Sequence, residues 1–265
     1  MFFIIILLFS RLHKTCLFPN FSILLLDEPL MDCVSYFQEG MCMEIRYARN
    51  IPALTEAECV LLRGKTVAVI GCGGLGGYLI EYLTRIGIGA IRCVDGDVFE
   101  ESNLNRQLLS TVANLGSSKA EAAAERVRAI NPQVQATAYP VFLQEANARE
   151  LIRGCDAVLD ALDNIVSRRV LARACAEENI PYIYGAIAGW VTQAAVCMPG
   201  EDLIDKLYPA DAMMKDNSVL SFTPPLCAAM QVSLCVKLLV GKPVETGMLH
   251  YADLFYEEYT QIPMK

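Results

Sequence analysis

Glycine residues directly after an apolar run are the first indication of chemistry in this chain. Gly71, Gly73, Gly74 and Gly76 lie in the segment Gly-Cys-Gly-Gly-Leu-Gly, between a predicted strand and a predicted helix. Glycines let the backbone turn tightly and bring its amides close to phosphates at the positive end of a helix. Asp95 ends the next predicted strand, where a carboxylate can accept hydrogen bonds from ribose hydroxyls. The pattern predicts a nucleotide site without specifying the nucleotide.

Further polar residues downstream could act on a bound nucleotide. They are Asp97, Ser102, Asn103, Arg106, Gln107, Lys119 and Asp163. The spacing Ser118-x-x-Glu121 predicts a capping box, which places Lys119 in the first turn of a helix, where the helix dipole disfavours positive charge. A lysine placed against this local preference indicates function. Asp163 precedes a helical stretch beginning at Ile165, and without a metal it is predicted to cap that helix.

Short apolar runs alternate with helical patterns and must position these residues. Strands are predicted at Thr66–Ile70, Ile91–Val94, Val134–Tyr139, Ala157–Leu159 and Tyr182–Tyr184, and helices at Leu75–Ile86, Ser118–Ile130, Ala146–Ile152 and Ser167–Glu178. Later β-rich stretches, Val191–Val196 and Leu249–Tyr259, flank a long apolar helix, Leu226–Val240. We therefore predict an α/β fold: a Rossmann-like, mostly parallel sheet with helices on both faces, continued by antiparallel strands in the C-terminal half.

The composition limits the class of partner and the compartment. The chain has 265 residues, with 22 basic and 30 acidic side chains and a formal net charge of −8. This acidic balance gives no electrostatic footprint for bulk binding to nucleic acid. The 11 cysteines include no Cys-x-x-Cys pair. They are therefore predicted to be reduced thiols, and we expect a cytoplasmic protein.

Two apolar runs near the N-terminus, Met1–Phe9 and Phe21–Leu26, are too short to span a bilayer. A helix over the first run reaches only about 13 Å, against a hydrocarbon core of about 30 Å. Arg11 and Lys14 follow this run, whereas a signal peptide has its positive charge before it. We expect residues 1–42 to be an extension outside the fold that results from an upstream start codon, without stable membrane association. A weak membrane anchor is the alternative.

The segment from Asp95 to Gln107, followed by Lys119 and by Leu159-Asp-Ala-Leu-Asp163-Asn, resembles the ThiF/MoeB/HesA family, the bacterial relatives of ubiquitin-activating E1 enzymes. Members of this family use ATP to adenylate the C-terminal Gly-Gly carboxylate of a small ubiquitin-like sulfur carrier, in thiamine, molybdopterin or another sulfur-insertion pathway. The resemblance implies an adenylyltransferase that uses ATP and Mg²⁺. It also implies one E1-like adenylation domain at residues 43–265, with a nucleotide-binding half at about 65–185 and a carrier-binding half at about 186–265.

The resemblance also implies roles for individual residues. Asp95 would hold the ribose, Asn103, Arg106 and Lys119 would contact the triphosphate, and Asp163 would bind Mg²⁺. The four glycines, Asp97, Ser102 and Gln107 are further candidate contacts to the nucleotide. The sequence Arg46-Tyr-Ala-Arg49-Asn-Ile resembles an element whose second arginine, here Arg49, reaches the ATP site of the neighbouring subunit. A homodimer is therefore implied.

Adenylate formation suits these residues on physical grounds. A terminal carboxylate with a pKa of about 3.5 is ionised at neutral pH, so the reaction requires no general base. Its attack on the α-phosphorus brings an anion to a polyanion and expels pyrophosphate. Cations and positioning should therefore supply most of the rate.

Two departures from the family pattern concern cysteine. Many members hold a structural zinc with two Cys-x-x-Cys pairs, and because this chain has neither pair, no structural zinc is expected. Members that pass sulfur through a covalent cysteine carry it before the long helix, where residues 201–225 contain none and Ser218 stands near the expected place. We therefore expect a separate sulfur donor. Cys227 and Cys72 are predicted to be buried structural thiols.

Three other functions fit part of the pattern. The glycine segment and Asp95 alone would suit an NAD-binding oxidoreductase, which leaves Arg106, Lys119 and Asp163 without roles. A variant within the family would adenylate a tRNA base or another substrate, and the acidic charge argues against the tRNA base. A non-catalytic partner subunit should have lost some of these groups, and this chain retains them.

Overall fold

The structure is a computed structural model of the chain and describes residues 44–209 and 218–264. The expected extension, residues 1–42, lies outside the described residues. Residues from Glu44 onward form one unit. In the described part of the chain, no helix combines the length and the apolar character needed to cross a membrane.

The strands are β1 (Thr66–Ile70), β2 (Ala90–Val94), β3 (Gln135–Tyr139), β4 (Ala157–Asp160), β5 (Tyr182–Ala188), β6 (Val191–Cys197), β7 (Met248–Asp253) and β8 (Glu258–Pro263). The α-helices are α2 (Glu56–Arg63), α3 (Gly74–Ile86), α4 (Lys119–Ile130), α5 (Ala148–Ile152), α6 (Ile165–Glu177), α7 (Leu203–Leu207) and α8 (Thr223–Leu239). Short 3-10 helices are η2 (Ile45–Asn50), η3 (Glu101–Asn103) and η4 (Val112–Asn114). The helices and strands predicted up to β5 are all present; most differ by one or two residues at their ends, whereas β5 continues from the predicted end at Tyr184 to Ala188.

The strands form one sheet in the order β3-β2-β1-β4-β5-β6-β7-β8. Strands β3, β2, β1, β4 and β5 are parallel, and β6, β7 and β8 continue the sheet in antiparallel pairs. Both β1 and β4 are apolar over most of their length and largely buried, as expected for central strands covered on both faces. The predicted fold class is therefore confirmed.

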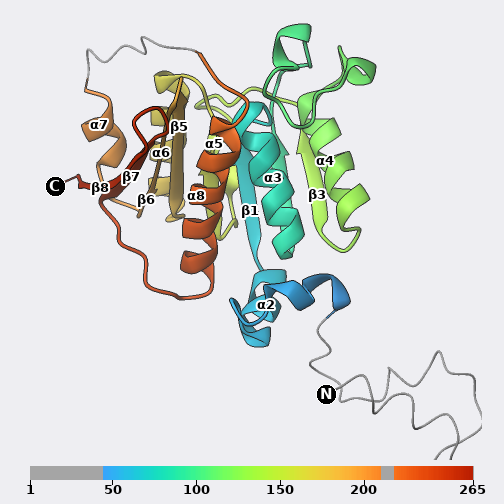
Figure 1. Ribbon diagram of the computed structural model, residues 1–265, viewed down its shortest axis with the longest axis horizontal. Coiled ribbons are helices and arrows are strands. Elements are labelled where there is room, and N and C mark those ends of the chain that lie inside the picture. The colour runs from blue at the N-terminus through green and yellow to red at the C-terminus, as the bar shows by residue number, and fades with distance from the viewer. Residues whose placement is uncertain (1–43, 210–217, 265) are drawn as a thin grey trace, which may run out of the picture. The chain divides into compact units, whose positions relative to one another are not determined.

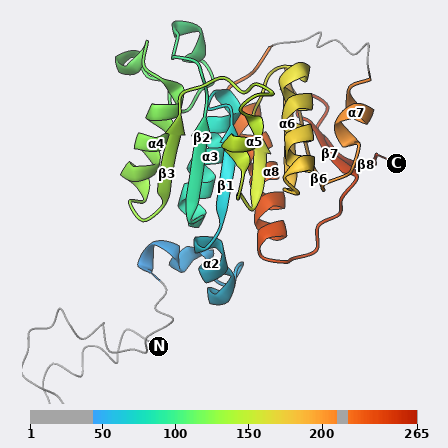
Figure 2. The ribbon, with the colours of Figure 1, turned by 180° about the vertical axis from the view of Figure 1, so that it is seen from behind.

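Helices cover both faces of the sheet. Helices α3, α4 and α8 lie on one face, where α3 packs between the other two (Figure 1). Helices α5, α6 and α7 lie on the opposite face (Figure 2). Because each helical crossover returns the chain to the start of the next parallel strand, the loops that follow β1, β2, β4 and β5 gather at one end of the sheet.

The C-terminal half contains more structure than the sequence predicts. The β-rich stretch Leu249–Tyr259 belongs to a hairpin of β7 and β8, and the short helix α7 was not predicted. Helix α8 begins at Thr223, before the predicted first residue Leu226. Pro224 and Pro225 occupy its first turn, where the missing amide of proline costs no intrahelical hydrogen bond.

The 3-10 helix η2 lies at the C-terminal ends of α3 and α4. Tyr47 of η2 is buried, and its hydroxyl accepts a 2.6 Å hydrogen bond from Asn131 Nδ2. Its ring packs against Gly87, which has a φ of 94° and where a Cβ would stand 2.7 Å from the ring. Asn50 donates to the Ile86 carbonyl. The 13 residues of α3 therefore separate η2 from the glycine segment, a distance of about 20 Å.

Candidate active site

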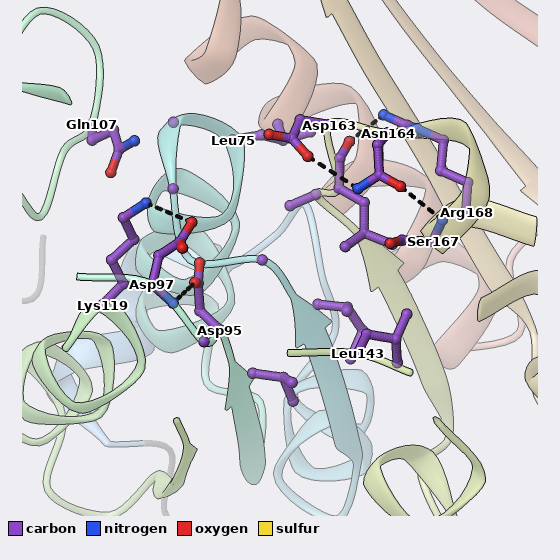
Figure 3. Close-up of a pocket in the computed structure, with 18 of the residues that line it drawn as sticks. Leu75, Asp95, Asp97, Gln107, Lys119, Leu143, Asp163, Asn164, Ser167 and Arg168 are labelled. Carbon is purple, nitrogen blue, oxygen red and sulfur yellow. Dashed lines mark hydrogen bonds and ion pairs between the residues drawn. The ribbon is translucent and has the colours of Figure 1, made fainter. Parts of the chain in front are cut away.

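The loops at the C-terminal ends of the parallel strands enclose a cavity of about 440 Å³. It lies where the chain order of the sheet reverses, between β1 and β4, which is the usual ligand position in open α/β sheets. Figure 3 shows Asp95, Asp97 and Lys119 on one side of it and Asp163, Asn164 and Arg168 on the other. The structure thus brings together residues that are widely separated in the sequence.

The glycine segment forms a tight turn between β1 and α3. Gly71 has a φ of 98°, a left-handed conformation that favours glycine, and its amide donates to the Val94 carbonyl at 2.8 Å. Gly73 is the N-cap residue of α3, and among the described residues no side chain caps this helix. Gly73 and Gly74 line the cavity, so the uncapped amides of α3 begin at its wall. Such a helix start binds anionic groups.

Gly76 has a packing role in this turn, and it does not line the cavity. A Cβ at Gly76 would stand 1.8 Å from the Gly71 carbonyl oxygen, a contact with backbone that cannot be relieved by side-chain movement. A Cβ at Gly74 would instead stand 3.5 Å from Arg106 Cγ, which is ordinary contact. The two glycines therefore meet different constraints.

We expect Gly76→Ala to destabilise the protein by about 1–3 kcal/mol and to remove the stabilisation expected from binding of the predicted ligand ATP, because the turn must open to admit the methyl group. Thermal unfolding with and without ATP measures both effects. Gly74→Ala is the matched control for stability and should melt close to the wild type. Equal melting temperatures of the two variants would contradict this account of the turn.

Asp95 is held at the cavity wall by backbone amides. Its Oδ2 accepts a 2.7 Å hydrogen bond from the Cys72 amide, and its Oδ1 accepts a 2.8 Å bond from the Asp97 amide. Burial raises the pKa of Asp95 above its usual range, partly opposed by these two bonds. The carboxylate is thereby oriented beside the glycine turn, as a ribose contact requires.

Two cations occupy the same side of the cavity. Lys119 is buried, and its Nζ lies 3.3 Å from Oδ2 of Asp97, whose backbone carbonyl also accepts the Lys119 amide. Arg106 is half-buried, and its Nη1 donates to the Ser102 carbonyl and to Asn105 Oδ1. Because Arg106 has no carboxylate partner among the described residues, its charge is available to an anionic ligand.

The capping predictions were partly wrong. Ser118 caps α4 by accepting a hydrogen bond from the Glu121 amide, but among the described contacts the reciprocal half of the predicted box does not form. Asn164, rather than Asp163, is the N-cap of α6, and its Oδ1 accepts a 2.8 Å bond from the Ser167 amide. The Asn164 side chain satisfies the helix amide, so the exposed Asp163 carboxylate does not cap the helix and, among the described residues, accepts a hydrogen bond only from Asn164 Nδ2, at 3.3 Å.

The cavity collects most of the predicted site residues. Those that line it are Gly71, Gly73, Gly74, Asp95, Asp97, Arg106, Gln107, Lys119 and Asp163. Ser102 and Asn103 do not line it, and Asn103 is buried in η3 with its Oδ1 accepting from the Glu100 amide. Arg49 is an exposed residue of η2, at the far end of α3 from the cavity. The predicted contacts of these residues with ATP remain predictions.

Sequence reasoning missed an apolar wall and a buried arginine. Val141, Phe142 and Leu143 line the cavity just after β3, and Phe142 packs so closely on Gly96 that a Cβ there would stand 2.6 Å from its ring. An apolar wall near Asp95, the predicted ribose contact, suits a nucleotide base. Arg168 also lines the cavity. Neither feature has a sequence signal of its own, since both depend on segments that meet only in the fold.

The predicted burial of Cys72 and Cys227 is confirmed. Cys72 and Cys227 are both fully buried. Burial raises the pKa of the Cys227 thiol to about 11, the direction opposite to that of an activated thiol. Its Sγ donates to the Gln193 carbonyl at 3.3 Å. A structural role therefore fits both thiols.

The fold and the cavity are those of an α/β protein suited to bind a nucleotide, and comparisons with known proteins identify its family. Residues 47–265 match the ThiF family. The chain belongs to this family. It is 34% identical over 225 residues to the SAMP-activating enzyme E1 of Haloferax volcanii, covering 80% of this chain and 83% of that protein. It is also 34% identical over 207 residues to the sulfur carrier protein adenylyltransferase of Thermus thermophilus, covering 73% of this chain and 76% of that protein.

Solved structures agree with the fold. The crystal structure of E. coli MccB with ATP superposes with a TM-score of 0.73 at 19% sequence identity, covering 85% of this chain and 73% of that one. At this identity the likeness shows the fold alone. The predicted family and the predicted enzyme class, an adenylyltransferase of the ThiF/MoeB type, are both confirmed by the family match and the named relatives.

Proposed function

We propose that the protein uses ATP to adenylate the C-terminal glycine carboxylate of a small ubiquitin-like sulfur-carrier protein. The observation that carries the proposal is the cavity itself, which combines an uncapped helix start, an Asp95 carboxylate held by two backbone amides and the cations Arg106 and Lys119. The names of the relatives support a sulfur carrier as the substrate. An oxidoreductase would require only the glycine turn and Asp95, and it would leave the two cations unexplained.

The chemistry follows from the charges around the cavity. The carrier's terminal carboxylate is ionised at neutral pH and needs no base, so the barrier is the approach of this anion to the triphosphate. Arg106 and Lys119 neutralise phosphate charge, and the first backbone amides of α3 donate hydrogen bonds to phosphate oxygens. Lys119 must leave its ion pair with Asp97 to contact the nucleotide. This requires only a small movement of the side chain, because Lys119 already lies at the cavity wall.

The carrier tail is proposed to enter from the side of β5 and α8. Ala186, Ile187, Val219 and Pro224 line the cavity there, and they belong to the half of the domain, about 186–265, expected to bind the carrier. These small and apolar side chains suit a narrow Gly-Gly tail. The nucleotide-binding half, about 65–185, supplies the opposite wall. We propose that residues 43–265 act as this single adenylation domain.

Mg²⁺ is proposed as the metal that accompanies ATP. Asp163 is exposed at the cavity and forms no ion pair among the described residues, so its carboxylate can serve as a ligand. One carboxylate together with substrate phosphates is the donor set that Mg²⁺ commonly uses. The metal would neutralise charge on the phosphates.

We also propose that the protein forms a homodimer and acts with a separate sulfur donor. Arg49 cannot reach the cavity of its own chain, about one length of α3 away, so a role at an ATP site requires a homodimer. We further propose that the adenylated carrier is passed to a separate sulfur donor and that the enzyme is cytoplasmic.

Carrier-dependent exchange between ATP and pyrophosphate tests the proposal. The purified chain is assayed with a panel of small proteins that end in Gly-Gly, each paired with a version that lacks the final glycine. We expect exchange with at least one intact carrier and none with its truncated form. Binding of NAD in preference to ATP, or exchange that does not depend on the terminal glycine, would refute the assignment.

We expect Cys227→Ser to retain both adenylation and sulfur transfer with an added donor. The reason is that burial raises the pKa of this thiol to about 11, so it is neither ionised nor accessible at neutral pH. The measurement is mass spectrometry of the carrier product, with a non-reducing gel for adducts. A reducible adduct between enzyme and carrier that disappears in the variant would contradict the expectation.

A further inference from the structure

Strands β4 and β5 part at the cavity end of the sheet. Their pairing covers only Val158 with Tyr182 and Leu159 with Ile183, although β5 continues to Ala188. Gln231 of α8 bridges the gap, because its Nε2 lies 2.9 Å from the Asp160 carbonyl and 2.9 Å from the Ile183 carbonyl. The ends of these two strands are therefore joined by side chains in place of ladder hydrogen bonds.

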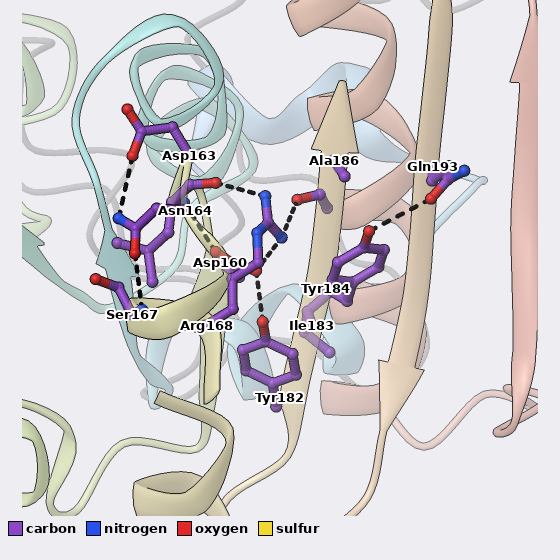
Figure 4. A network of polar contacts seen from close by, with 12 residues as sticks. Asp160, Asp163, Asn164, Ser167, Arg168, Tyr182, Ile183, Tyr184, Ala186 and Gln193 are labelled. Carbon is purple, nitrogen blue, oxygen red and sulfur yellow. Dashed lines mark hydrogen bonds and ion pairs between the residues drawn. The ribbon is translucent and has the colours of Figure 1, made fainter. Parts of the chain in front are cut away.

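Arg168 of α6 is the second bridge across this gap (Figure 4). Its Nη1 donates to the Gly185 carbonyl of β5 at 2.8 Å, and its Nη2 donates to the Leu162 carbonyl. Nη1 also pairs with the Asp160 carboxylate at 2.5 Å, and both side chains are almost completely buried. Arg168 thus binds the backbone on both sides of the gap.

The charge of Arg168 is already neutralised. Asp160 pairs with it, and the Tyr182 hydroxyl donates to the same carboxylate. The ring of Tyr184 lies 5.1 Å from the guanidinium carbon. A buried pair of this kind is weak evidence for stability, since apolar residues of similar size often serve as well. Stability therefore does not explain Arg168, and its role lies in the backbone segments that its hydrogen bonds hold in place.

The two backbone groups that Arg168 binds belong to two neighbouring segments that contribute residues to the cavity lining. Leu162 precedes Asp163, the proposed metal ligand, in the segment 160–164, called here the Asp163 loop. Gly185 precedes Ala186 and Ile187, which line the proposed path of the carrier tail. One guanidinium therefore sets the spacing between the nucleotide side and the tail side.

We propose that Arg168 is a positioning residue that holds the Asp163 loop and the Gly185–Ile187 segment in register, so that the carrier carboxylate meets the α-phosphate. The inference rests on the proposed function for its kinetic part only. Holding two reacting groups in the correct geometry is a large source of rate, and a displacement of about 1 Å can cost about 100-fold. Arg168 does so without contributing net charge.

The test uses a variant that removes the hydrogen bonds without leaving a buried charge. Arg168→Met alone would strand the Asp160 carboxylate and can fail to fold, so it is combined with Asp160→Asn, which retains an acceptor for the Leu162 amide. The matched control is Arg169→Met. Arg169 is the next residue of α6 and also pairs with an aspartate, Asp205, outside the cavity lining.

Three measurements follow on the full chain. Hydrogen exchange should show faster exchange of the amides at 162–164 in the double variant than in Arg169→Met, at similar melting temperatures. The affinity for a non-hydrolysable ATP analogue should stay close to the wild type, whereas kcat for carrier-dependent exchange should fall by about 100-fold with a smaller change in KM. A kcat equal to that of Arg169→Met, or unchanged protection of the Asp163 loop, would overturn the proposal.

Failure of the proposed function and failure of the positioning role of Arg168 give different results. If the wild type shows no carrier-dependent exchange, the proposed function fails. The hydrogen-exchange comparison still decides whether Arg168 holds the Asp163 loop, because it needs neither ATP nor a carrier. Lost protection of the loop in the double variant supports the positioning role, and retained protection refutes it.

Discussion

Replacement of Arg106 or Lys119 by alanine is expected to remove about 2–4 kcal/mol of transition-state stabilisation, a loss of about 30- to 1,000-fold in kcat/KM for carrier-dependent exchange. Both cations lie at the cavity wall beside the start of α3, where the phosphates are proposed to bind. The fold should survive both changes. Asp97, which loses its partner in Lys119→Ala, keeps a carboxylate that is 56% exposed and can be solvated.

Arg128→Ala is the control for this pair of variants. Arg128 is an exposed residue of α4, the helix that carries Lys119, and its Nη2 donates to the Ala136 carbonyl outside the cavity lining. Circular dichroism and melting temperatures establish that each variant is folded. Exchange at the wild-type rate in Arg106→Ala or Lys119→Ala, or an equal loss in Arg128→Ala, would show that the phosphates do not bind here.

The second large effect concerns Arg49, which we propose acts on the ATP site of a second subunit. Its 3-10 helix is anchored through Tyr47 and Asn131 at the end of α3 opposite to the glycine turn. A cation delivered from a neighbouring chain could stabilise the charge of the leaving pyrophosphate without crowding that turn. Arg49→Ala and Asp163→Ala are each expected to be nearly inactive as homodimers.

Mixed dimers of these two variants should regain activity. One of their two sites combines an intact Asp163 with an intact Arg49 from the other chain. Random pairing makes about half of the dimers mixed, so equal amounts of the two variants, refolded together, should recover about a quarter of wild-type activity if the sites are independent.

Formation of mixed dimers must be demonstrated separately, for example with differently tagged chains. Lack of recovered activity can then not be explained by a failure of the two variants to pair. If mixed dimers form and remain inactive, Arg49 does not act on the ATP site of a second subunit. Recovery well above a quarter would indicate that the two sites are not independent.

The local parts of the site could be predicted from the sequence. Gly71 and Gly76 signal a turn for different reasons. Gly71 adopts a left-handed backbone conformation, and Gly76 lies so close to the Gly71 carbonyl that a Cβ would prevent the contact. The alternation of buried strands and helices predicts a parallel sheet, which places the residue after each strand at one end of the molecule. Asp95 and Asp163 meet at the cavity for this reason, although the sequence separates them widely.

What the sequence by itself determined was therefore the alternating strands and helices from β1 to β5, the glycine turn and the polar residues that follow β1, β2 and β4. Only the tertiary structure showed that Phe142 closes the cavity against Gly96, that Arg168 joins the Asp163 loop to β5, and that Arg49 lies far from its own cavity. The physical reason is that strand and helix signals, like glycine turns, arise from neighbours along the chain. Burial, ion pairing and reach depend on segments brought together by packing, and a residue such as Arg168 has the same local pattern whether it faces solvent or a strand.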